Sequence, residues 1–382
     1  MKTLSALIVL AVMSLAPARA AADGCPLPCS GPSASPPDAK LLFAQPLGEA
    51  GPLQAYDTST GQLRFALPAG RASADGRWFV SARRTDGATF LERRETASGG
   101  VLRVDRVVGL WTIAAVSPDG RFVALSRPAG ATTDIRLVGG AGRVLHRLRL
   151  PGDVEVEAVS KDGARLFLIE HVDDKRYRVR TLDLRSALQQ TIRKRGVLAP
   201  MTGYAWTAVA SRDGRWLLTL YVDTARRSAF VHALDLVHAR PLCIAVPSRG
   251  SETALRRYSL KLSPSGTTLF AANPALGAVA ELDLARLTVT RVTRFRPPRI
   301  ADPPWRRGAT ATVSRDGRTL YFTAGRSLLA LDRSRGVVRG PYRTWGRVVG
   351  LGFGAGDRRV HVLRADGRLV AFDAASGRML AR

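Results

Sequence analysis

A short phrase, Ser-x-Asp-Gly or a close variant, returns along the sequence and constrains the fold more than any other feature. Successive serines lie 44, 43, 51, 52 and 51 residues apart, at Ser73, Ser117, Ser160, Ser211, Ser263 and Ser314. A decayed copy occupies residues 354–357. A period in this range is typical of repeat proteins in which each unit is one small supersecondary element. The sequence therefore predicts one repetitive domain rather than several unrelated ones.

The residues around each phrase predict antiparallel strands. Asp-Gly favours the positive φ angles of a two-residue hairpin turn. Apolar runs flank it, for example residues 112–116 and 122–125. A second strand pair follows, joined by a turn that begins with Asp, as at Asp183 and Asp283. Each unit thus has four strands, and helical periodicity is almost absent.

Four-stranded sheets repeated around an axis form a β-propeller, an all-β fold that leaves only short strand edges exposed. Seven complete units are present, the last over residues 348–382. An N-terminal piece of three strands precedes them (41–44, 53–57 and 63–67) and lacks an obvious innermost strand. This piece either forms an eighth blade or interleaves with the C-terminal unit in a seven-bladed ring. The strand count favours eight blades.

With these units aligned, the chain resembles the secreted bacterial YVTN/WD40-like propeller repeats. The segments SPDGRFVALS (117–126) and VHALDLVHARP (231–241) are similar to the strand-hairpin-strand core of that family. The resemblance covers about residues 40–382 and implies the propeller fold. It implies no single activity, because this fold hosts many. The Trp-Asp dipeptide of WD40 repeats is absent.

The N-terminus predicts export. A basic start, an apolar run over residues 4–15, and Ala18 and Ala20 are typical of a signal peptide over residues 1–20, with an apolar run too short to span a bilayer. Residues 21–39 are rich in Pro and Ser and predict a tether, in which Cys25 and Cys29 could form a disulfide after export. Residues 40–382 would then form the propeller domain. We expect a secreted or periplasmic monomer without a transmembrane segment in the mature chain.

The charge balance favours anionic partners. Lys and Arg total 58 against 31 Asp and Glu, a net charge of +27, and 52 of the basic residues are Arg. Such a chain attracts polyanions, although a GC-rich genome also enriches Arg. The expected partners are a protein or an anionic polymer, such as a glycan, a cell-wall polymer or lipid headgroups. Nucleic acid is disfavoured, because the chain is exported and carries no recognition motif.

One long loop concentrates these arginines. Residues 291–307 (RVTRFRPPRIADPPWRR) contain six Arg, four Pro and two aromatic residues. Guanidinium groups bind phosphate, sulfate or carboxylate bidentately, and an indole can stack on a sugar or base. The candidate binding residues are Arg291, Arg294, Arg296, Arg299, Trp305, Arg306 and Arg307. The same predicted face carries Arg83, Arg84, Arg226, Arg227, Arg256, Arg257, Arg343 and Arg347.

A second candidate site lies in the predicted central channel. Glu155 and Glu157 are two residues apart on a predicted innermost strand, so both side chains face the same side. Two carboxylates there could bind a cation, or one could carry a raised pKa; alternatively they line a solvated wall. They are weak candidates for the catalytic groups of a lactonase-like hydrolase. The five histidines have no metal-binding spacing, and we expect no metal or other cofactor.

Residues 55–65 resemble the tryptophan-docking repeat of pyrroloquinoline-quinone dehydrogenases, and residues 371–381 echo it. Phe65 and Ala381 stand where that family has its final Trp, so an ordinary Asp turn explains both segments. We therefore predict an exported, non-catalytic binding or scaffold protein that contacts an anionic partner through its basic loop face. The alternative is an extracytoplasmic propeller enzyme, lactonase-like or quinoprotein-like, that uses the central channel.

Overall fold

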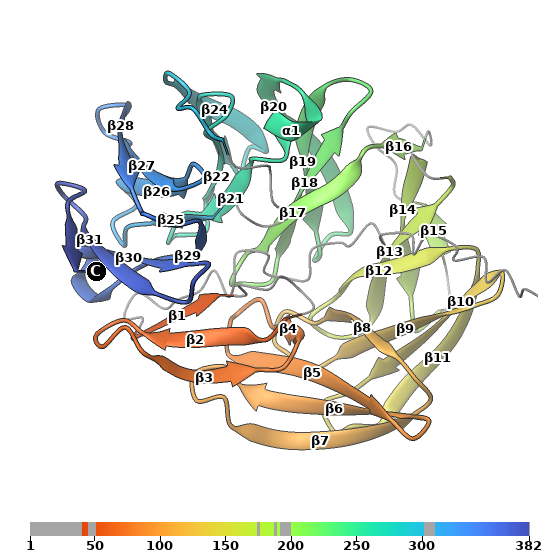
Figure 1. Ribbon diagram of the computed structural model, residues 1–382. Helices are drawn as coiled ribbons and strands as arrows, with labels where there is room; N and C mark the ends of the chain where they lie inside the picture. Colours follow the sequence, from red (N-terminus) through yellow and green to blue (C-terminus); the bar gives the residue numbers. More distant parts are fainter. Residues whose placement is uncertain are drawn as a thin grey trace, which may run out of the picture.

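Eight antiparallel sheets follow one another around a ring (Figure 1). The computed structural model describes residues 40–44, 51–173, 176–186, 189–191, 200–301 and 310–381. In these residues, helix is confined to α1 (Glu252–Leu255) and the 3-10 turn η1 (Ala355–Asp357). The predicted all-β propeller is confirmed, and so is the preference for eight blades. The predicted signal peptide and the predicted tether with Cys25 and Cys29 lie outside the described residues.

The strands of each sheet are consecutive in the chain. The first sheet holds β1 (Leu41–Ala44), β2 (Leu53–Asp57) and β3 (Leu63–Leu67). The second holds β4 (Gly70–Ala72), β5 (Trp78–Thr85), β6 (Ala88–Glu95) and β7 (Val101–Val108). The third holds β8 (Thr112–Val116), β9 (Val123–Ala129), β10 (Thr132–Val138) and β11 (Val144–Pro151). The fourth holds β12 (Val154–Val159), β13 (Arg165–His171), β14 (Arg176–Asp183) and β15 (Gln189–Thr191), and β16 (Met201–Thr202) also pairs with β14.

The other four sheets repeat this order. The fifth holds β17 (Tyr204–Ala210), β18 (Trp216–Asp223), β19 (Ser228–Asp235) and β20 (Arg240–Arg249). The sixth holds β21 (Ser259–Leu262), β22 (Thr268–Asn273), β23 (Ala278–Asp283) and β24 (Thr288–Arg294). The seventh holds β25 (Ala311–Val313), β26 (Thr319–Thr323), β27 (Ser327–Asp332) and β28 (Val337–Arg343). The eighth holds β29 (Val348–Phe353), β30 (Arg359–Arg364), β31 (Leu369–Asp373) and β32 (Met379–Ala381).

The repeated phrase joins the first and second strands of a sheet through a hydrogen-bonded loop. In the fifth sheet, the Ser211 hydroxyl donates to the Asp213 carboxylate (2.5 Å) and accepts from the Trp216 amide (2.8 Å). The Asp213 carboxylate also accepts from the Arg215 amide (3.0 Å). The loop is therefore held by side chains that the phrase itself supplies, and this explains why Ser and Asp recur together.

The expectation of a two-residue turn was wrong. The amide of Ser211 bonds to the carbonyl of Trp216, so four residues form the loop, and the amide of Gly214 bonds to the carbonyl of Ser211. Only the glycine has a positive φ, +73° at Gly214, whereas Asp213 does not. The aspartate is needed for its carboxylate rather than for an unusual backbone angle.

The first sheet contains the second, third and fourth strands of the common pattern. In complete sheets, the amide after the third strand bonds to a carbonyl just before the second strand, as from Leu236 to Arg215 (2.8 Å). The equivalent bond in the first sheet runs from Thr58 to Lys40 (2.9 Å), just before β1. No innermost strand falls on described residues of this sheet. The eighth sheet keeps four strands of its own, so the two do not interleave in the described chain.

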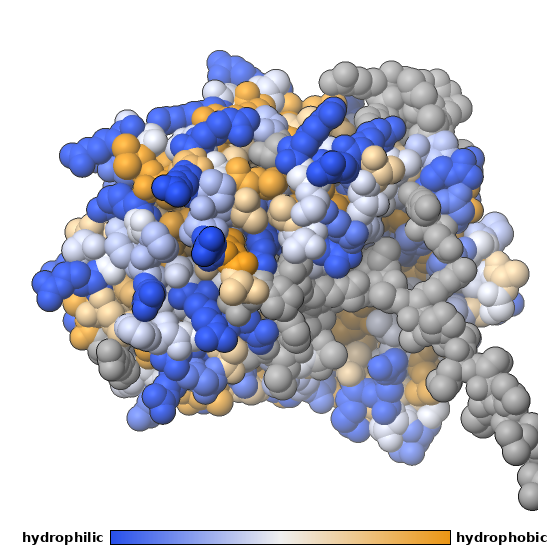
Figure 2. Space-filling view, turned by 45° about the horizontal axis from the view of Figure 1, so that its top comes forward, coloured by the Kyte–Doolittle hydropathy of each residue, from blue (hydrophilic) through white to orange (hydrophobic). Residues whose placement is uncertain are grey.

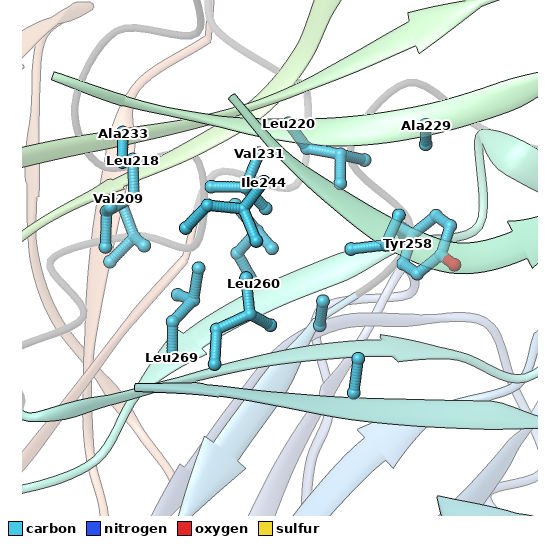
Figure 3. Packing of buried hydrophobic residues seen from close by; sticks show 14 of the residues in the cluster. Val209, Leu218, Leu220, Ala229, Val231, Ala233, Ile244, Tyr258, Leu260 and Leu269 are labelled. Atoms are coloured by element: carbon cyan, nitrogen blue, oxygen red, sulfur yellow. The ribbon is translucent and has the colours of Figure 1, made fainter. Parts of the chain in front are cut away.

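The core lies between the sheets. The largest apolar cluster joins the fifth and sixth sheets, where Val209, Leu218 and Val231 pack against Leu260 and Leu269 (Figure 3). Within the described residues, every other junction around the ring has an equivalent cluster. The ring closes where β1 packs beside the eighth sheet, and Figure 1 shows the two next to each other.

Ser211→Ala should destabilise the propeller. The substitution leaves the buried amide of Trp216 without its hydroxyl acceptor and removes the bond to Asp213. We expect the free energy of unfolding to fall by about 1–3 kcal/mol, measured by urea denaturation. Ser186→Ala, which removes an exposed hydroxyl in a turn of the fourth sheet, is the control and should change it by less than about 0.5 kcal/mol. Equal losses in both variants would contradict this account of the turn.

Acid should weaken these turns. Hydrogen bonds from the Ser160 and Ser314 hydroxyls lower the pKa of Asp162 and Asp316 below the ordinary value of 3.8. Their stabilisation is therefore present above that value and is lost as the pH falls through the lowered pKa of the folded state. We expect Ser160→Ala to reduce the drop in melting temperature between pH 5 and pH 2.5. An unchanged drop would show that Asp162 does not contribute.

Candidate functional site

Two sets of loops meet at one end of the ring, which we call the loop-bearing end. They are the turns between the second and third strands and the connections that lead to the next sheet. Backbone hydrogen bonds join the two sets: Gly109 to Gly87, Gly152 to Ala131, Gly250 to Arg227, Phe295 to Gly277 and Thr344 to Arg326. The Ser-Asp-Gly loops and the turns that begin with Asp lie at the opposite end of the strands.

Arginines crowd the loop-bearing end. The residues predicted to share this face do lie near its turns and connections: Arg83, Arg84, Arg226, Arg227, Arg256, Arg257, Arg343 and Arg347. Some of them are neutralised locally, since Arg226 pairs with Asp223 at 2.8 Å and Arg256 pairs with Glu252. Figure 2 shows hydrophilic side chains spread over the face it presents, with hydrophobic ones in small separate patches.

The predicted basic loop is only partly directed toward this end. Arg291 lies in mid-strand β24, and its guanidinium donates to the carbonyl of Arg333 (2.6 Å) in a turn at the opposite end. Phe295 packs into the core of the sixth and seventh sheets. Arg296 and Arg299 are exposed, and Arg294, also exposed, donates to the Pro247 carbonyl (3.2 Å). The predicted residues Trp305, Arg306 and Arg307 fall on positions 302–309, outside the described residues.

Trp345 is a surface aromatic that the sequence did not single out. It lies in the connection between the seventh and eighth sheets, has a φ of +60°, and is 58% exposed. The Arg343 guanidinium lies 5.8 Å from the centre of its ring. A bulky residue held in the left-handed region and exposed to water is costly, and such strain concentrates at binding sites. The sequence signal was a Trp between two arginines in a short connection.

A small pocket of about 20 Å³, partly open to solvent, lies beside the innermost strands at the junction between the fourth and fifth sheets. Its polar lining comes from β4, β12 and β18: Arg71, Glu155, Glu157, Thr219 and Tyr221. Small and branched apolar residues of β13, β17 and β18 complete it. The structure therefore brings Glu155 and Glu157 together in one hollow.

A β-bulge directs Glu157 into this pocket. Val156 pairs with Leu168 and Ala158 pairs with Phe167, so Glu157 is an extra residue without a partner on β13. Bulges redirect side chains and are frequent near functional sites. Both carboxyl oxygens of Glu157 are buried and accept no hydrogen bond in the described part of the chain.

The pocket favours the neutral form of Glu157. Burial, with a smaller contribution from the nearby charge of Glu155, raises the pKa of Glu157 to about 8. Burial also raises the pKa of both Tyr177 and Tyr221 well above 10, and the negative charge of Glu157 adds to this. At neutral pH the pocket thus contains a protonated carboxyl group.

Two further charged groups surround Glu155. His171 places Nε2 3.7 Å from the Glu155 carboxylate, and this contact raises the pKa of the imidazole. Arg71 comes from the second sheet, passes over the third, and donates from Nε to the Ile113 carbonyl (3.2 Å). Sequence reasoning missed Arg71 and Tyr221, because both reach the pocket from other sheets. The neighbouring Asp173 pairs with Arg176 at 2.5 Å, as in an ordinary surface turn.

Behind the pocket lies a buried aromatic and sulfur cluster. The rings of Tyr177 and Tyr221 stack with centres 5.1 Å apart, and Tyr221 also stacks on Phe230 at 5.4 Å. His232 is fully buried, and its Nδ1 lies 3.9 Å from the Sγ atom of Cys243. In the described chain, no three His, Cys, Asp or Glu residues form a group that could hold a metal ion.

The suspected quinoprotein segment forms an ordinary turn. The Asp57 carboxylate accepts from the amides of Ser59 (2.8 Å) and Thr60 (3.1 Å). Asp183 and Asp283 make the equivalent bonds in the fourth and sixth sheets. This arrangement belongs to the common repeat and not to a special docking segment.

Comparison with known proteins supports the fold alone. No protein-family model matches the sequence, and no curated protein matches it. The solved structure of the dihydro-heme d1 dehydrogenase NirN, in complex with DHE, is similar with a TM-score of 0.54 and 18% identity, covering 91% of this chain and 73% of that one. Apo AztD from Citrobacter koseri is similar with a TM-score of 0.52 and 13% identity, covering 89% and 93%. At such identities the likeness shows a β-propeller, and membership of the YVTN/WD40-like family stays a prediction.

None of the helices in the described residues has the length and apolar character that crossing a bilayer requires.

Glu157→Gln should alter how stability depends on pH. The pKa of Glu157 is about 8 in the folded chain and 4.5 ordinarily, so between these values the folded state keeps a proton that the unfolded state loses. The wild type should therefore lose stability as the pH rises through this range, by up to about 1.4 kcal/mol per pH unit. We expect Glu157→Gln to abolish this loss in urea denaturation at pH 5 and pH 8. The surface control Glu95→Gln should lose stability between pH 5 and pH 8 as the wild type does. The same loss in Glu157→Gln would show that Glu157 is not the group with the raised pKa.

Proposed function

We propose that this protein is an exported, non-catalytic binding module whose loop-bearing end holds an anionic polymer, such as a glycan or cell-wall polymer. The observation that carries the proposal is the set of exposed arginines Arg294, Arg296 and Arg299. Their side chains meet no described carboxylate, so their charge is available to a partner. Guanidinium groups bind carboxylate, sulfate and phosphate through paired hydrogen bonds.

The surroundings of these arginines support the proposal. Phe295 is anchored in the core beside Phe322, with ring centres 5.8 Å apart, so one end of the basic segment is held by the sheets. A held segment loses less conformational freedom on binding. Trp345 and Arg343 add an aromatic ring and a further cation at the same end. An indole can cover the apolar face of a sugar ring.

A charge-matched pair of triple variants tests the proposal. Replacing Arg294, Arg296 and Arg299 by Ser should lower the salt concentration that elutes the protein from heparin, a sulfated glycan. The slope of log affinity against log salt should become shallower by about 2–3, if each contact behaves as in other polyanion complexes. The control replaces Arg286, Arg318 and Arg335, which have exposed side chains at the opposite end. It removes the same charge and should elute nearly as the wild type does. Equal effects in both variants would show general attraction and would overturn the proposal.

A second candidate function, an enzyme that uses the channel, is favoured by one observation. A buried carboxyl with a pKa of about 8 can donate a proton at neutral pH, as a general acid must. Hydrolysis of esters or lactones in a substrate screen, lost in Glu157→Gln but kept in the arginine triple variant, would establish this function. Absence of turnover with retained heparin binding would leave the binding module.

A further inference from the structure

The junction between the fourth and fifth sheets is the place where the apolar packing of the ring is divided. Ala158, Phe167 and Leu217 form one cluster toward the Ser-Asp-Gly end. Ile169, Tyr177 and Tyr221 belong to a second cluster toward the loop-bearing end. The Glu157 pocket lies against both clusters, since Ile169, Leu217 and Tyr221 line it. In the described chain, each other junction has a single cluster.

The Glu157 carboxyl is held in this gap without a partner. Its two oxygens are buried and receive no hydrogen bond from a described residue, although a buried polar atom left without a partner is costly. The bulge at this residue turns the carboxyl toward the hollow rather than toward β13. The two carboxyl oxygens of Glu157 can therefore accept hydrogen bonds from the N–H groups of a bound ligand.

The charges around the pocket select the kind of donor. The groups that face Glu157 are Glu155 on the same strand, Arg71 from β4, and Tyr177 and Tyr221 from β14 and β18, with His171 acting through Glu155. Arg71 and Glu155 carry opposite charges, and His171, which pairs with Glu155, adds a positive charge only when it is protonated. When His171 is neutral, one positive charge on the ligand balances one newly ionised Glu157. A divalent metal ion would leave an excess of positive charge beside a guanidinium, and no third ligand is at hand in the described residues.

We propose that this pocket binds a small organic cation, an alkylammonium or guanidinium group, whose N–H groups donate to the two oxygens of Glu157. Glu157 gives up its proton to the solvent as the cation enters, and no covalent bond of the ligand changes. The ring of Tyr221 lines the same hollow and can cover the cation. The site is separate from the arginines of the loop-bearing end, so it does not depend on the proposed function.

The test is a calorimetric titration of the full chain with methylammonium and with methylguanidinium near pH 7. Repeating each titration in two buffers of different ionisation enthalpy counts the protons released. We expect close to one proton per bound cation, and a smaller number above the pKa of about 8. Acetamide, which is neutral, and Ca²⁺ serve as controls of charge and of ligand class. Glu157→Gln should weaken binding by about tenfold or more and abolish the proton release.

A spectroscopic measurement keeps the test independent of the variant. The infrared carbonyl stretch of a protonated carboxyl should be present in the free wild-type protein and should disappear when methylammonium binds. Glu95→Gln should bind and release the proton as the wild type does. The proposal is overturned if neither methylammonium nor methylguanidinium binds with a dissociation constant below about 10 mM. Binding without proton release, binding that survives Glu157→Gln, or tighter binding of Ca²⁺ than of the organic cations would also overturn it.

Discussion

Face-to-face packing of each sheet on both of its neighbours is the constraint on which the rest of this molecule depends. A four-stranded sheet here has two apolar faces, and neither is covered until both adjacent sheets are in place. Val209 and Leu218 on one sheet find their partners in Leu260 and Leu269 on the next. Because every sheet has the same requirement, the chain must continue around a ring. The ring then gathers the connections at one end and the innermost strands around a common axis.

The junction between the fourth and fifth sheets interrupts this apolar packing with polar side chains, which costs stability. At the junction between the fourth and fifth sheets, two acidic side chains line a hollow beside a stacked pair of tyrosines. Keeping Glu157 protonated avoids the much larger cost of burying an unpaired charge. Natural proteins depart from consistent packing mainly where a function requires it. The Glu157 pocket and the exposed arginines of the loop-bearing end are thus two separate polar features, one inside the ring and one at its end.

The sequence could predict what repeats and could not predict what happens once. The recurring serines and aspartates predicted the strand order within each sheet, and the strand count favoured the eight blades that the structure has. Bulges recur on the innermost strands β8, β12, β17 and β29. The sequence does not reveal that the bulge on β12 places a carboxyl in the pocket, because this depends on how β12 pairs with β13. Arg71 reaches the pocket from two sheets away, which no spacing in the sequence reveals. Arg291 was expected on the loop-bearing end, but its guanidinium donates to the carbonyl of Arg333 in the next sheet and so points to the opposite end.

Exposure was equally hard to predict for the tryptophans. Trp111 and Trp216 are buried between sheets, whereas Trp345 stands in solvent. All three lie beside arginines that reach over their rings. The neighbouring residue types are therefore similar, and only the path of the connecting chain separates a core residue from a surface one. An aromatic side chain can serve either role, since its ring is apolar and its edge is polar.

The way the ring closes has a mechanical consequence. Each of the other seven joints between sheets is crossed by the chain itself, but the joint between β1 and β29 is not. This joint is held by side chains: Leu42, Ala44 and Tyr56 of the first sheet pack against Leu363 of the eighth. The two sheets approach closely at Gly350, where an added Cβ atom would lie 2.8 Å from the Cβ atom of Ala44. Among the described residues, no strand pairing and no peptide bond crosses this joint. In the described part of the chain, the ring is thus closed covalently at seven joints and by side-chain packing at the eighth.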